Sequence, residues 1–437
     1  MPARSYPPAL APSANHAPSY YAATVREAVA TRTLNSSLRC EVCVIGGGYA
    51  GVSTALHLAR RGVDVVLLEQ SRVGWGASGR NGGQVHVGMR RDQLWLEARV
   101  GLPAAHRYWK LALEARAHLD WLLATYAIQC DFRPGLLHAD HRPRYSAETR
   151  RHVEHLQHRY DYPHIRFVDH EEIRALVGTN AYHSGSLDAR GGHLHALNYA
   201  VGIARAAVGH GARIYESVEA AAPEAEGRGW RVRTPRGDIY AARVVMACNG
   251  YMRGLSAPVE RRVMPINNFI AVTAPLGAER AKSLIANGAA VADSRFVVNY
   301  FRITPDHRLL FGGGENYGYR FPRDIAAFVR PHVLGVFPQL ADVGFDYAWG
   351  GTLGITPTRM PLVRELEPGL FNASGFSGLG VLLAPYSGKV LADALCGERA
   401  SFDLMGLIPV PSFPGGPALR WPTLVAAMSF YALRDRL

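Results

Sequence analysis

Lysine is almost absent from this chain of 437 residues. Only Lys110, Lys282 and Lys389 are lysines, so 48 − 3 = 45 of the basic residues are arginines, and the formal net charge is +12. Arginine binds carboxylates and phosphates through a planar, bidentate guanidinium group. The arginines are spread along the whole chain instead of clustering among aromatic residues, which argues against a nucleic-acid partner. The positive charge therefore favours an anionic cofactor or substrate.

Cysteine and long apolar runs are also scarce. Five cysteines, an odd number, exclude a disulfide framework. Residues 1–30 hold five prolines and no apolar core segment, so we expect no signal peptide. The longest apolar stretch near the end, Leu424–Leu433, is too short to span a bilayer. We therefore expect a cytoplasmic protein without a membrane span.

A strand–turn–helix–strand unit follows the first 38 residues. The run EVCVI at 41–45 is typical of a buried parallel strand, 52–61 has helical periodicity, and VDVVLLE at 63–69 predicts a second buried strand. Two such strands joined through a helix must be parallel. The sequence therefore predicts a βαβ unit.

A glycine motif lies at the turn of this unit. Gly46, Gly48 and Gly51 satisfy G-x-G-x-x-G between the strand and the helix. Gly46 permits the tight turn, Gly48 the approach of a pyrophosphate, and Gly51 the packing of helix on strand. Glu69 ends the second strand, where a carboxylate can hold ribose hydroxyls. Together these residues predict a dinucleotide site.

Two further glycine-rich segments indicate which dinucleotide is bound. Residues 72–88 read RVGWGASGRNGGQVHVG, and a loop of this kind lets the backbone pack closely on a large planar ligand such as an isoalloxazine. Residues 370–397 give a strand, a loop with Gly375, Gly378 and Gly380, and a helix whose positive end can face the flavin. An NAD-dependent dehydrogenase is the weaker alternative, because these two loops would then have no role.

The remaining segments predict a second kind of sheet. Residues 198–208 are helical in pattern, 230–247 predict a hairpin, and 259–349 alternate as in an antiparallel sheet. We predict an α/β plus α+β protein. One discontinuous Rossmann-like domain contains a parallel sheet, and a second domain contains a mainly antiparallel sheet.

Several motifs together resemble a known family. IGGGYAG, GWGASGRNGGQ and ASGFSGLGV look like the amine and amino-acid oxidases of the D-amino-acid oxidase and glycine oxidase superfamily. SYYAA at 19–23, RGGHLHALN at 190–198, NYFRITPDHRLLFGGG at 299–314, TRMP at 358–361 and the tail FPGG…LRDR bring the resemblance closest to γ-glutamylputrescine oxidoreductases. The match covers nearly the whole chain.

The resemblance implies a domain division and a set of cofactor contacts. The segments are an N-terminal arm (1–38), an FAD-binding domain (39–115, 188–258 and 350–400), a substrate domain (116–187 and 259–349) and a C-terminal tail (401–437). The implied FAD-binding residues are Gly46, Gly48, Tyr49, Ala50, Gly51, Glu69, Gln70, Gly76, Ala77, Ser78, Asn81, Gly82, Gly83, Gln84, Val218, Asn249, Gly250, Gly351, Gly375, Gly378, Leu379, Gly380 and Val381.

Four departures from related families are informative. Relatives often carry His where this chain has Leu379, and others attach flavin through a Cys in the segment matching 349–356, which here holds none. We therefore expect noncovalent FAD. A Lys that holds a free amino-acid carboxylate is replaced by apolar residues at 381–383, which favours a larger or neutral amine. The segment 300–315 also holds no Lys to assist oxygen, so either Arg302, Arg308 or a His such as His86 assists it, or the electrons pass to another acceptor.

Four residues are candidates for the reaction site. His86 follows the second glycine loop and Tyr300 lies in the antiparallel sheet, and both are candidate catalytic residues, with ordinary packing as the alternative. Arg302 is a candidate to bind substrate. Trp349 is a candidate pocket wall, or else fills a core.

Some residues that resemble metal or redox motifs have structural interpretations. Cys40 and Cys43 are three apart on a strand, so we expect them to face opposite sides and to pack. His193 and His195 have no further ligand at metal spacing, so structural hydrogen bonding is expected and no metal site is predicted.

The resemblance implies a function in putrescine catabolism. The reaction would be oxidation of a γ-glutamylated diamine such as γ-glutamylputrescine by hydride transfer to flavin N5, giving aldehyde, ammonia and hydrogen peroxide. One alternative is oxidation or dehydrogenation of another primary, secondary or N-methyl amine. An alternative from another class is a non-catalytic, flavin-bearing electron-transfer or assembly subunit.

Overall fold

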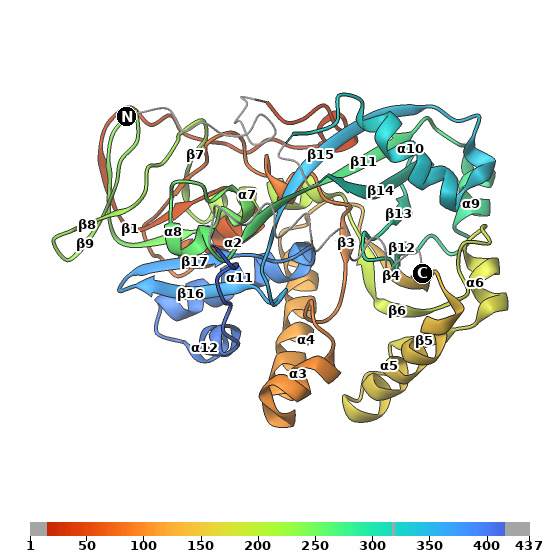
Figure 1. Ribbon diagram of the computed structural model, residues 1–437. Helices are drawn as coiled ribbons and strands as arrows, with labels where there is room; N and C mark the ends of the chain where they lie inside the picture. The colour runs from red at the N-terminus through yellow and green to blue at the C-terminus, as the bar shows by residue number, and fades with distance from the viewer. Residues whose placement is uncertain (1–14, 317–319, 416–437) are drawn as a thin grey trace.

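The first of two sheets is built around β1 (Leu38–Ile45), as Figure 1 shows. In the computed structural model, which describes residues 15–316 and 320–415, the strand order is β16-β17-β10-β1-β2-β7. The pairs β17–β10, β10–β1, β1–β2 and β2–β7 are parallel, and β9 pairs antiparallel with β10 as the predicted hairpin. The other strands are β2 (Val65–Leu68), β7 (Arg213–Tyr215), β8 (Glu224–Glu226), β9 (Gly229–Val232), β10 (Ile239–Met246), β16 (Leu362–Glu367) and β17 (Leu370–Ser374).

The second sheet is antiparallel except where β12 runs parallel to β4. Its order is β15-β11-β14-β13-β12-β4-β6-β3, with β5 beside β6. This arrangement of a mainly parallel and a mainly antiparallel sheet confirms the predicted fold class. The strands are β3 (Gln84–Val85), β4 (Arg133–Asp140), β5 (Ile165–Val168), β6 (Ser184–His193), β11 (Met264–Thr273), β12 (Ala290–Asp293), β13 (Tyr300–Ile303), β14 (Leu309–Asn316) and β15 (Phe345–Ile355).

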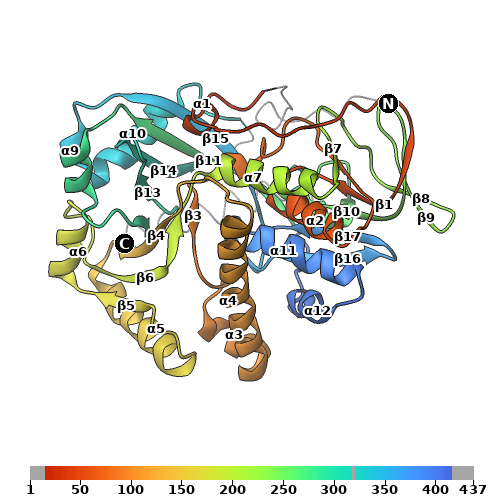
Figure 2. The same ribbon diagram turned by 180° about the vertical axis from the view of Figure 1, so that it is seen from behind.

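Helices cover one face of the first sheet, as Figure 2 shows from behind. Apolar residues of α2, α4, α7 and α11 form one core with Val42 and Val44 of β1. The α10 helix packs on the second sheet in a separate core. The helices are α1 (Tyr20–Ala23), α2 (Tyr49–Ala59), α3 (Gln93–Val100), α4 (Leu102–Thr125), α5 (Ser146–Arg159), α6 (His170–Leu176), α7 (Ala196–Gly209), α8 (Ala257–Glu260), α9 (Ala278–Leu284), α10 (Ile325–Val336), α11 (Gly380–Leu395) and α12 (Ala400–Gly406).

An irregularity in β1 overturns one expectation. The backbone N–H groups of Glu41 and Val42 both donate to Asp64 O, at 3.0 and 3.2 Å, which interrupts the alternation of the strand. Cys40 and Cys43 consequently contact the same apolar core, so the expectation that they face opposite sides was wrong. Burial raises the pKa of Cys40 to about 12, as expected for a packing residue rather than a reactive thiol.

The predicted domain segments do not coincide with the two sheets. The proposed boundaries at 188 and 350 fall inside β6 and β15, two strands of the second sheet, and β3 joins that sheet from the first proposed segment. The start of the proposed arm (1–14) and most of the proposed tail (416–437), including Leu424–Leu433, lie outside the described residues.

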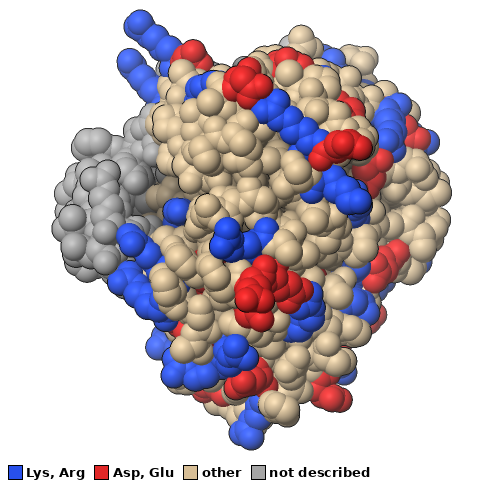
Figure 3. Space-filling model, turned by 90° about the vertical axis from the view of Figure 1, so that its right-hand side faces the viewer, with Lys and Arg blue, Asp and Glu red and all other residues tan. Residues whose placement is uncertain are grey.

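The surface of the second sheet's end carries charges of both signs. Figure 3 shows basic and acidic side chains interspersed on this face. Exposed ion pairs such as Arg166–Glu172 and Arg280–Asp342 account for part of the mixture. Across the described ranges 15–316 and 320–415, none of the helices has both the length and the apolar character needed to cross a membrane.

Candidate active site

The first glycine turn joins β1 to α2 by close backbone contacts. Gly46 has φ +109°, and its N–H donates to Leu68 O at 2.8 Å. A Cβ on Gly46 would lie 2.8 Å from Ala247 O, and one on Gly51 would lie 1.9 Å from Gly46 O. Glycine at both positions therefore lets α2 begin directly against the strand, with Gly48 as its N-cap.

Glu69 follows β2 and faces this turn. Its carboxylate accepts hydrogen bonds from the backbone N–H groups of Gly47, at 2.7 Å, and Ser71, at 2.8 Å. Burial raises the pKa of Glu69 to about 7, and the two N–H donors oppose that rise. The carboxylate is thus fixed at the edge of the sheet beside the N-terminus of α2.

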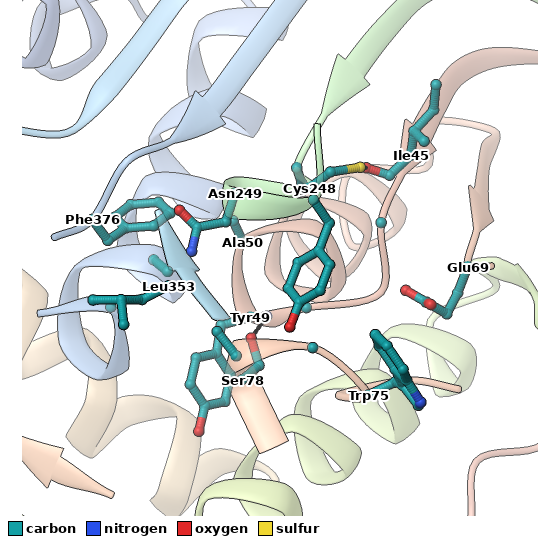
Figure 4. A pocket seen from close by; sticks show the side chains of 18 of the residues that line it. Ile45, Tyr49, Ala50, Glu69, Trp75, Ser78, Cys248, Asn249, Leu353 and Phe376 are labelled. Carbon is teal, nitrogen blue, oxygen red and sulfur yellow. Dashed lines mark hydrogen bonds between the residues drawn. The ribbon is translucent and has the colours of Figure 1, made fainter. Parts of the chain in front are cut away.

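A long cavity extends from this carboxylate along the carboxyl ends of the parallel strands. Its empty volume is about 1210 Å³, including space open to solvent, which exceeds the ~300–1,000 Å³ of common small-molecule pockets. In Figure 4, Glu69 and Trp75 lie on one side of the cavity, with Leu353 and Phe376 on the other. The cavity is therefore large enough for an elongated ligand, with a carboxylate at one end and apolar side chains at the other.

Polar contacts fix the middle of the cavity wall. Ser78 Oγ accepts from the N–H of Tyr49 at 2.9 Å, and Cys248 Sγ donates to Ile45 O at 3.2 Å. Asn249, with φ +47°, accepts from the N–H of Gly375 at 2.8 Å. These bonds tie the second and third glycine-rich segments to the first, so all three predicted glycine loops meet at one cavity.

Many of the predicted cofactor residues line this cavity, and the others lie outside its lining. Those in the lining are Gly46, Gly48, Tyr49, Ala50, Glu69, Gln70, Gly76, Ala77, Ser78, Asn81, Val218, Asn249, Gly378, Gly380 and Val381. Those outside it are Gly51, Gly82, Gly83, Gln84, Gly250, Gly351, Gly375 and Leu379. Several of the latter are glycines that allow close packing behind the wall; a Cβ on Gly375, for example, would lie 2.4 Å from Thr356 Cγ2.

Sequence reasoning missed several large residues of the lining. Trp75 and Tyr251 form an edge-to-face pair with ring centroids 5.7 Å apart. Trp75 and Phe376 lie within glycine motifs that the sequence does show, so aromatic residues inside those motifs could have been included. Leu353 comes from β15, and nothing in its local sequence connects it with the glycine loops.

The two candidate catalytic residues lie at the second sheet. His86 Nε2 lies 3.3 Å from Gln84 Oε1, and burial lowers the pKa of His86 to about 3, with Arg90 and His138 contributing. Because Gln84 Nε2 donates to Val291 O, its Oε1 must accept, which places the proton of the neutral imidazole on Nε2. His86 is therefore neutral at pH 7, with Nδ1 unprotonated.

Tyr300 is held between two glycines. Its hydroxyl donates to Asn268 Oδ1. A Cβ on Gly82 would lie 2.5 Å from Tyr300 Cε2, and one on Gly312 would lie 2.0 Å from Tyr300 Cζ. The ring therefore occupies space that side chains at both positions would fill, and it lies against the loop that follows Asn81 of the cavity.

Arg302 and Trp349 lie in the interior rather than in the cavity lining. Arg302 is 3% exposed and donates to Gly82 O, Leu194 O and the hydroxyl of Tyr21. Trp349 is 2% exposed and donates from Nε1 to Arg80 O at 3.0 Å. These contacts favour structural or positioning roles over direct contact with a substrate.

The histidines predicted to be structural have such contacts. His193 Nε2 donates to Gly288 O at 3.1 Å, and His195 Nδ1 accepts from the N–H of Asn198 at 3.0 Å, where it caps α7. Among the residues that the structure describes, no three or more His, Cys, Asp and Glu side chains form a group suited to a metal ion.

The site fits a flavin dinucleotide. The N-terminus of α2, with the positive end of its helix dipole at the cavity, suits a pyrophosphate, and Glu69 suits ribose hydroxyls. The aromatic and apolar far end suits a planar ring, and a Cβ at Gly48 would approach Ser78 Oγ to 2.9 Å and narrow the cavity. Cys248 is the one cysteine in the lining, and it contacts the first glycine turn rather than the apolar end.

Comparisons with known proteins agree with this geometry. The family model of the FAD dependent oxidoreductases (DAO) matches residues 41–394. The chain is 41% identical over 418 residues to a probable oxidoreductase OrdL of Rhizobium meliloti (96% of this chain, 97% of the relative). It is 38% identical over 428 residues to the gamma-glutamylputrescine oxidoreductase of Escherichia coli K12 (97% and 99%).

Solved structures show the same fold. Glycine oxidase from Geobacillus kaustophilus superposes with a TM-score of 0.73 at 22% identity, covering 86% of this chain and 100% of that protein. L-proline dehydrogenase from P. horikoshii gives 0.70 at 19% identity, covering 84% and 96%. The predicted FAD cofactor is confirmed. The chain belongs to the DAO family of FAD-dependent oxidoreductases and is an FAD-dependent amine oxidoreductase.

Proposed function

We propose that this enzyme oxidises a γ-glutamylated diamine such as γ-glutamylputrescine. The observation that carries the proposal is the near full-length similarity to the E. coli enzyme named for that substrate. Val381, Leu382 and Leu383 after the third glycine loop are buried apolar residues, which disfavours a free α-carboxylate at that position. A substrate whose carboxylate lies far from its reacting amine avoids this conflict.

The reaction removes two electrons and two protons from the CH–NH₂ group and gives an imine. FAD, when bound, accepts the hydride, and water hydrolyses the imine to aldehyde and ammonia. The amine must be neutral to lose hydride, and exclusion of water beside the apolar end of the cavity favours the neutral form. We assign His86, neutral with an unprotonated Nδ1, to accept a hydrogen bond from the neutral substrate amine, and Tyr300 to orient that amine.

We assign the distant glutamyl carboxylate to Arg90. Its Nε donates to Ser377 O at 3.1 Å, and Ser377 lines the cavity beside Phe376. Arg90 is solvent-exposed, and its charge acts on both His86 and His138, lowering their pKa values. A guanidinium anchored at the apolar end of the cavity is suited to a carboxylate.

Molecular oxygen is the proposed electron acceptor, which would give hydrogen peroxide. All three lysines lie among the described residues and outside the lining of the cavity, so oxygen reduction would proceed without a lysine there. Noncovalent attachment of FAD is also proposed. All five cysteines lie among the described residues, and none of them lines the apolar end of the cavity. Colour that stays with acid-precipitated protein would contradict it.

The test is an anaerobic titration of the purified holoenzyme, followed by the visible flavin band. γ-Glutamylputrescine, putrescine and sarcosine are compared, and air is then admitted with a peroxide assay. We expect bleaching by γ-glutamylputrescine at least about tenfold more efficiently than by putrescine, and peroxide on aeration. Bleaching by sarcosine instead would indicate an N-methyl amine substrate, and bleaching without reoxidation would indicate a dehydrogenase.

A further inference from the structure

The N-terminal arm connects the two sheets. Tyr20 and Tyr21 of α1 are 5% and 0% exposed, and Ser19 caps this short helix by accepting from the N–H of Ala22 at 3.1 Å. In Figure 2, α1 lies near β15 of the second sheet and near α7, a helix that packs on the first sheet. On the side of the first sheet, Trp75 Nε1 of the cavity donates to Asn15 O at 3.0 Å. The arm thus contacts the cavity wall at one point and enters the interior at another.

Two adjacent tyrosines of α1 point their hydroxyls to different partners. Tyr20 donates to Asp306 at 2.8 Å, on the turn between β13 and β14 of the second sheet. The hydroxyl of Tyr21 accepts from Arg302 at 3.1 Å. Both side chains are buried. Removing each hydroxyl in turn therefore separates the effect of the bond to Arg302 from the general effect of fixing the arm to the protein.

Arg302 is a buried cation whose described hydrogen-bond partners are neutral oxygens. Besides Tyr21, it donates from Nε to Gly82 O at 3.0 Å and from Nη2 to Leu194 O at 3.2 Å. A guanidinium buried in this way must satisfy its donors locally, because no water replaces a lost partner. Loss of the Tyr21 hydroxyl would therefore disturb the other two bonds.

Those two bonds hold the loop that leads out of the cavity wall. Asn81 lines the cavity and accepts from the N–H of Gly83 at 2.7 Å. Gly83 O in turn accepts from the N–H of Leu194 at 2.9 Å, and a Cβ on Gly83 would lie 2.0 Å from Leu194 O. Arg302 therefore binds Gly82 O and Leu194 O, one on each side of a tightly packed turn directly behind Asn81.

We propose that Tyr21 and Arg302 are positioning residues for the FAD site, which they hold in shape through the Asn81–Gly83 turn. The N-terminal arm is then a component of the cofactor site, although it lies outside the nucleotide-binding motifs. The inference rests on the FAD site and is independent of the identity of the amine.

The test measures FAD binding by apoprotein prepared from the full chain, without any substrate. The variants are Tyr21→Phe, which removes one hydroxyl, and Arg302→Lys, which keeps the charge but loses the planar guanidinium group and its several N–H donors. Tyr20→Phe is the matched control, since it removes the hydroxyl of the adjacent buried tyrosine from the same helix. Circular dichroism and thermal melting of each apoprotein report whether it is folded.

We expect Tyr21→Phe to raise the Kd for FAD about tenfold and Arg302→Lys at least tenfold, with a shifted visible flavin spectrum. Tyr20→Phe should change the Kd less than twofold while lowering the melting temperature as much as Tyr21→Phe does. Unchanged FAD affinity in Tyr21→Phe would overturn the proposal. An equal loss in Tyr20→Phe would also overturn it, because the effect would then come from general loosening of the arm.

Discussion

The two ends of the cavity are built in different ways. At the dinucleotide end, Gly46, Gly48, Gly51 and Glu69 come from 24 consecutive residues and act mostly through the backbone. At the end near Tyr300, the candidate reaction residues lie beyond the apolar lining; they are side chains of β13 and of the loop after β3, and Arg90 of that loop donates to the backbone of the third glycine loop. The first end therefore depends on the absence of side chains, whereas the region beyond the second depends on charged and polar side chains brought together by the second sheet.

The largest expected effect comes from adding one methyl group at the dinucleotide end. Gly51→Ala places a Cβ 1.9 Å from Gly46 O, so α2 must move away from the turn. We expect a loss of roughly 2–4 kcal/mol in the free energy of unfolding and at least about a hundredfold weaker FAD binding. Denaturant unfolding and FAD titration measure the two effects.

Gly209→Ala is the control for this substitution, because a Cβ at Gly209 meets no atom within 4 Å. It should change stability by less than about 0.5 kcal/mol and leave FAD affinity unchanged. Normal FAD binding in Gly51→Ala would show that the turn can relax, and the contrast between the two ends would then lose its basis.

An intermediate effect is expected when a charge is removed at the other end. Arg90→Gln should raise the KM for γ-glutamylputrescine about ten- to a hundredfold, with FAD affinity and activity on putrescine little changed. Arg91→Gln is the matched control, since Arg91 carries the same charge but donates to Thr358 O. An equal rise in both variants would mean that only the net charge of the region matters.

The smallest effect expected of a single substitution concerns one proton. Burial lowers the pKa of His86, His118, His193 and His195 to about 3 and that of His57 to about 2. The unfolded chain therefore binds more protons below pH 6.5, and stability should decrease as the pH falls from 6.5 toward 3. Each such histidine contributes up to ~1.4 kcal/mol per pH unit in that window.

Denaturant midpoints measured between pH 7.5 and 5 test this expectation. His86→Gln should reduce the slope by up to one proton, because it removes one of the five imidazoles that are held neutral by burial. A midpoint that stays constant over this range would show that the histidines are not buried in the neutral form.

The difference between the ends also explains what the sequence could predict. The glycine motif, Glu69 and the hairpin at 230–247 depend on neighbours along the chain, so spacing and apolar pattern were sufficient. The sequence around Arg302 and around Trp349 does not indicate that either side chain is buried. Their partners, Tyr21, Gly82, Leu194 and Arg80, lie far away in sequence, so only the folded chain distinguishes an interior residue from a pocket residue.

Cys40 and Cys43 illustrate a second limit of prediction from sequence, the direction of individual side chains on a strand. Alternation along a strand predicts opposite faces only while the hydrogen-bond register is regular. Glu41 and Val42 donate to the same acceptor, Asp64 O, which interrupts the alternation there, and no local residue type indicates this interruption. Local patterns therefore identified the strand but not the direction of every side chain on it.

The ring of Tyr300 constrains the order in which substitutions around it can occur. It fills the volume beside both Gly82 and Gly312, which belong to different segments of the chain. The three positions form one packing unit, so a side chain can enter at either glycine only after the residue at 300 has become smaller. Natural variation and directed evolution of this site would have to pass through that order of substitutions.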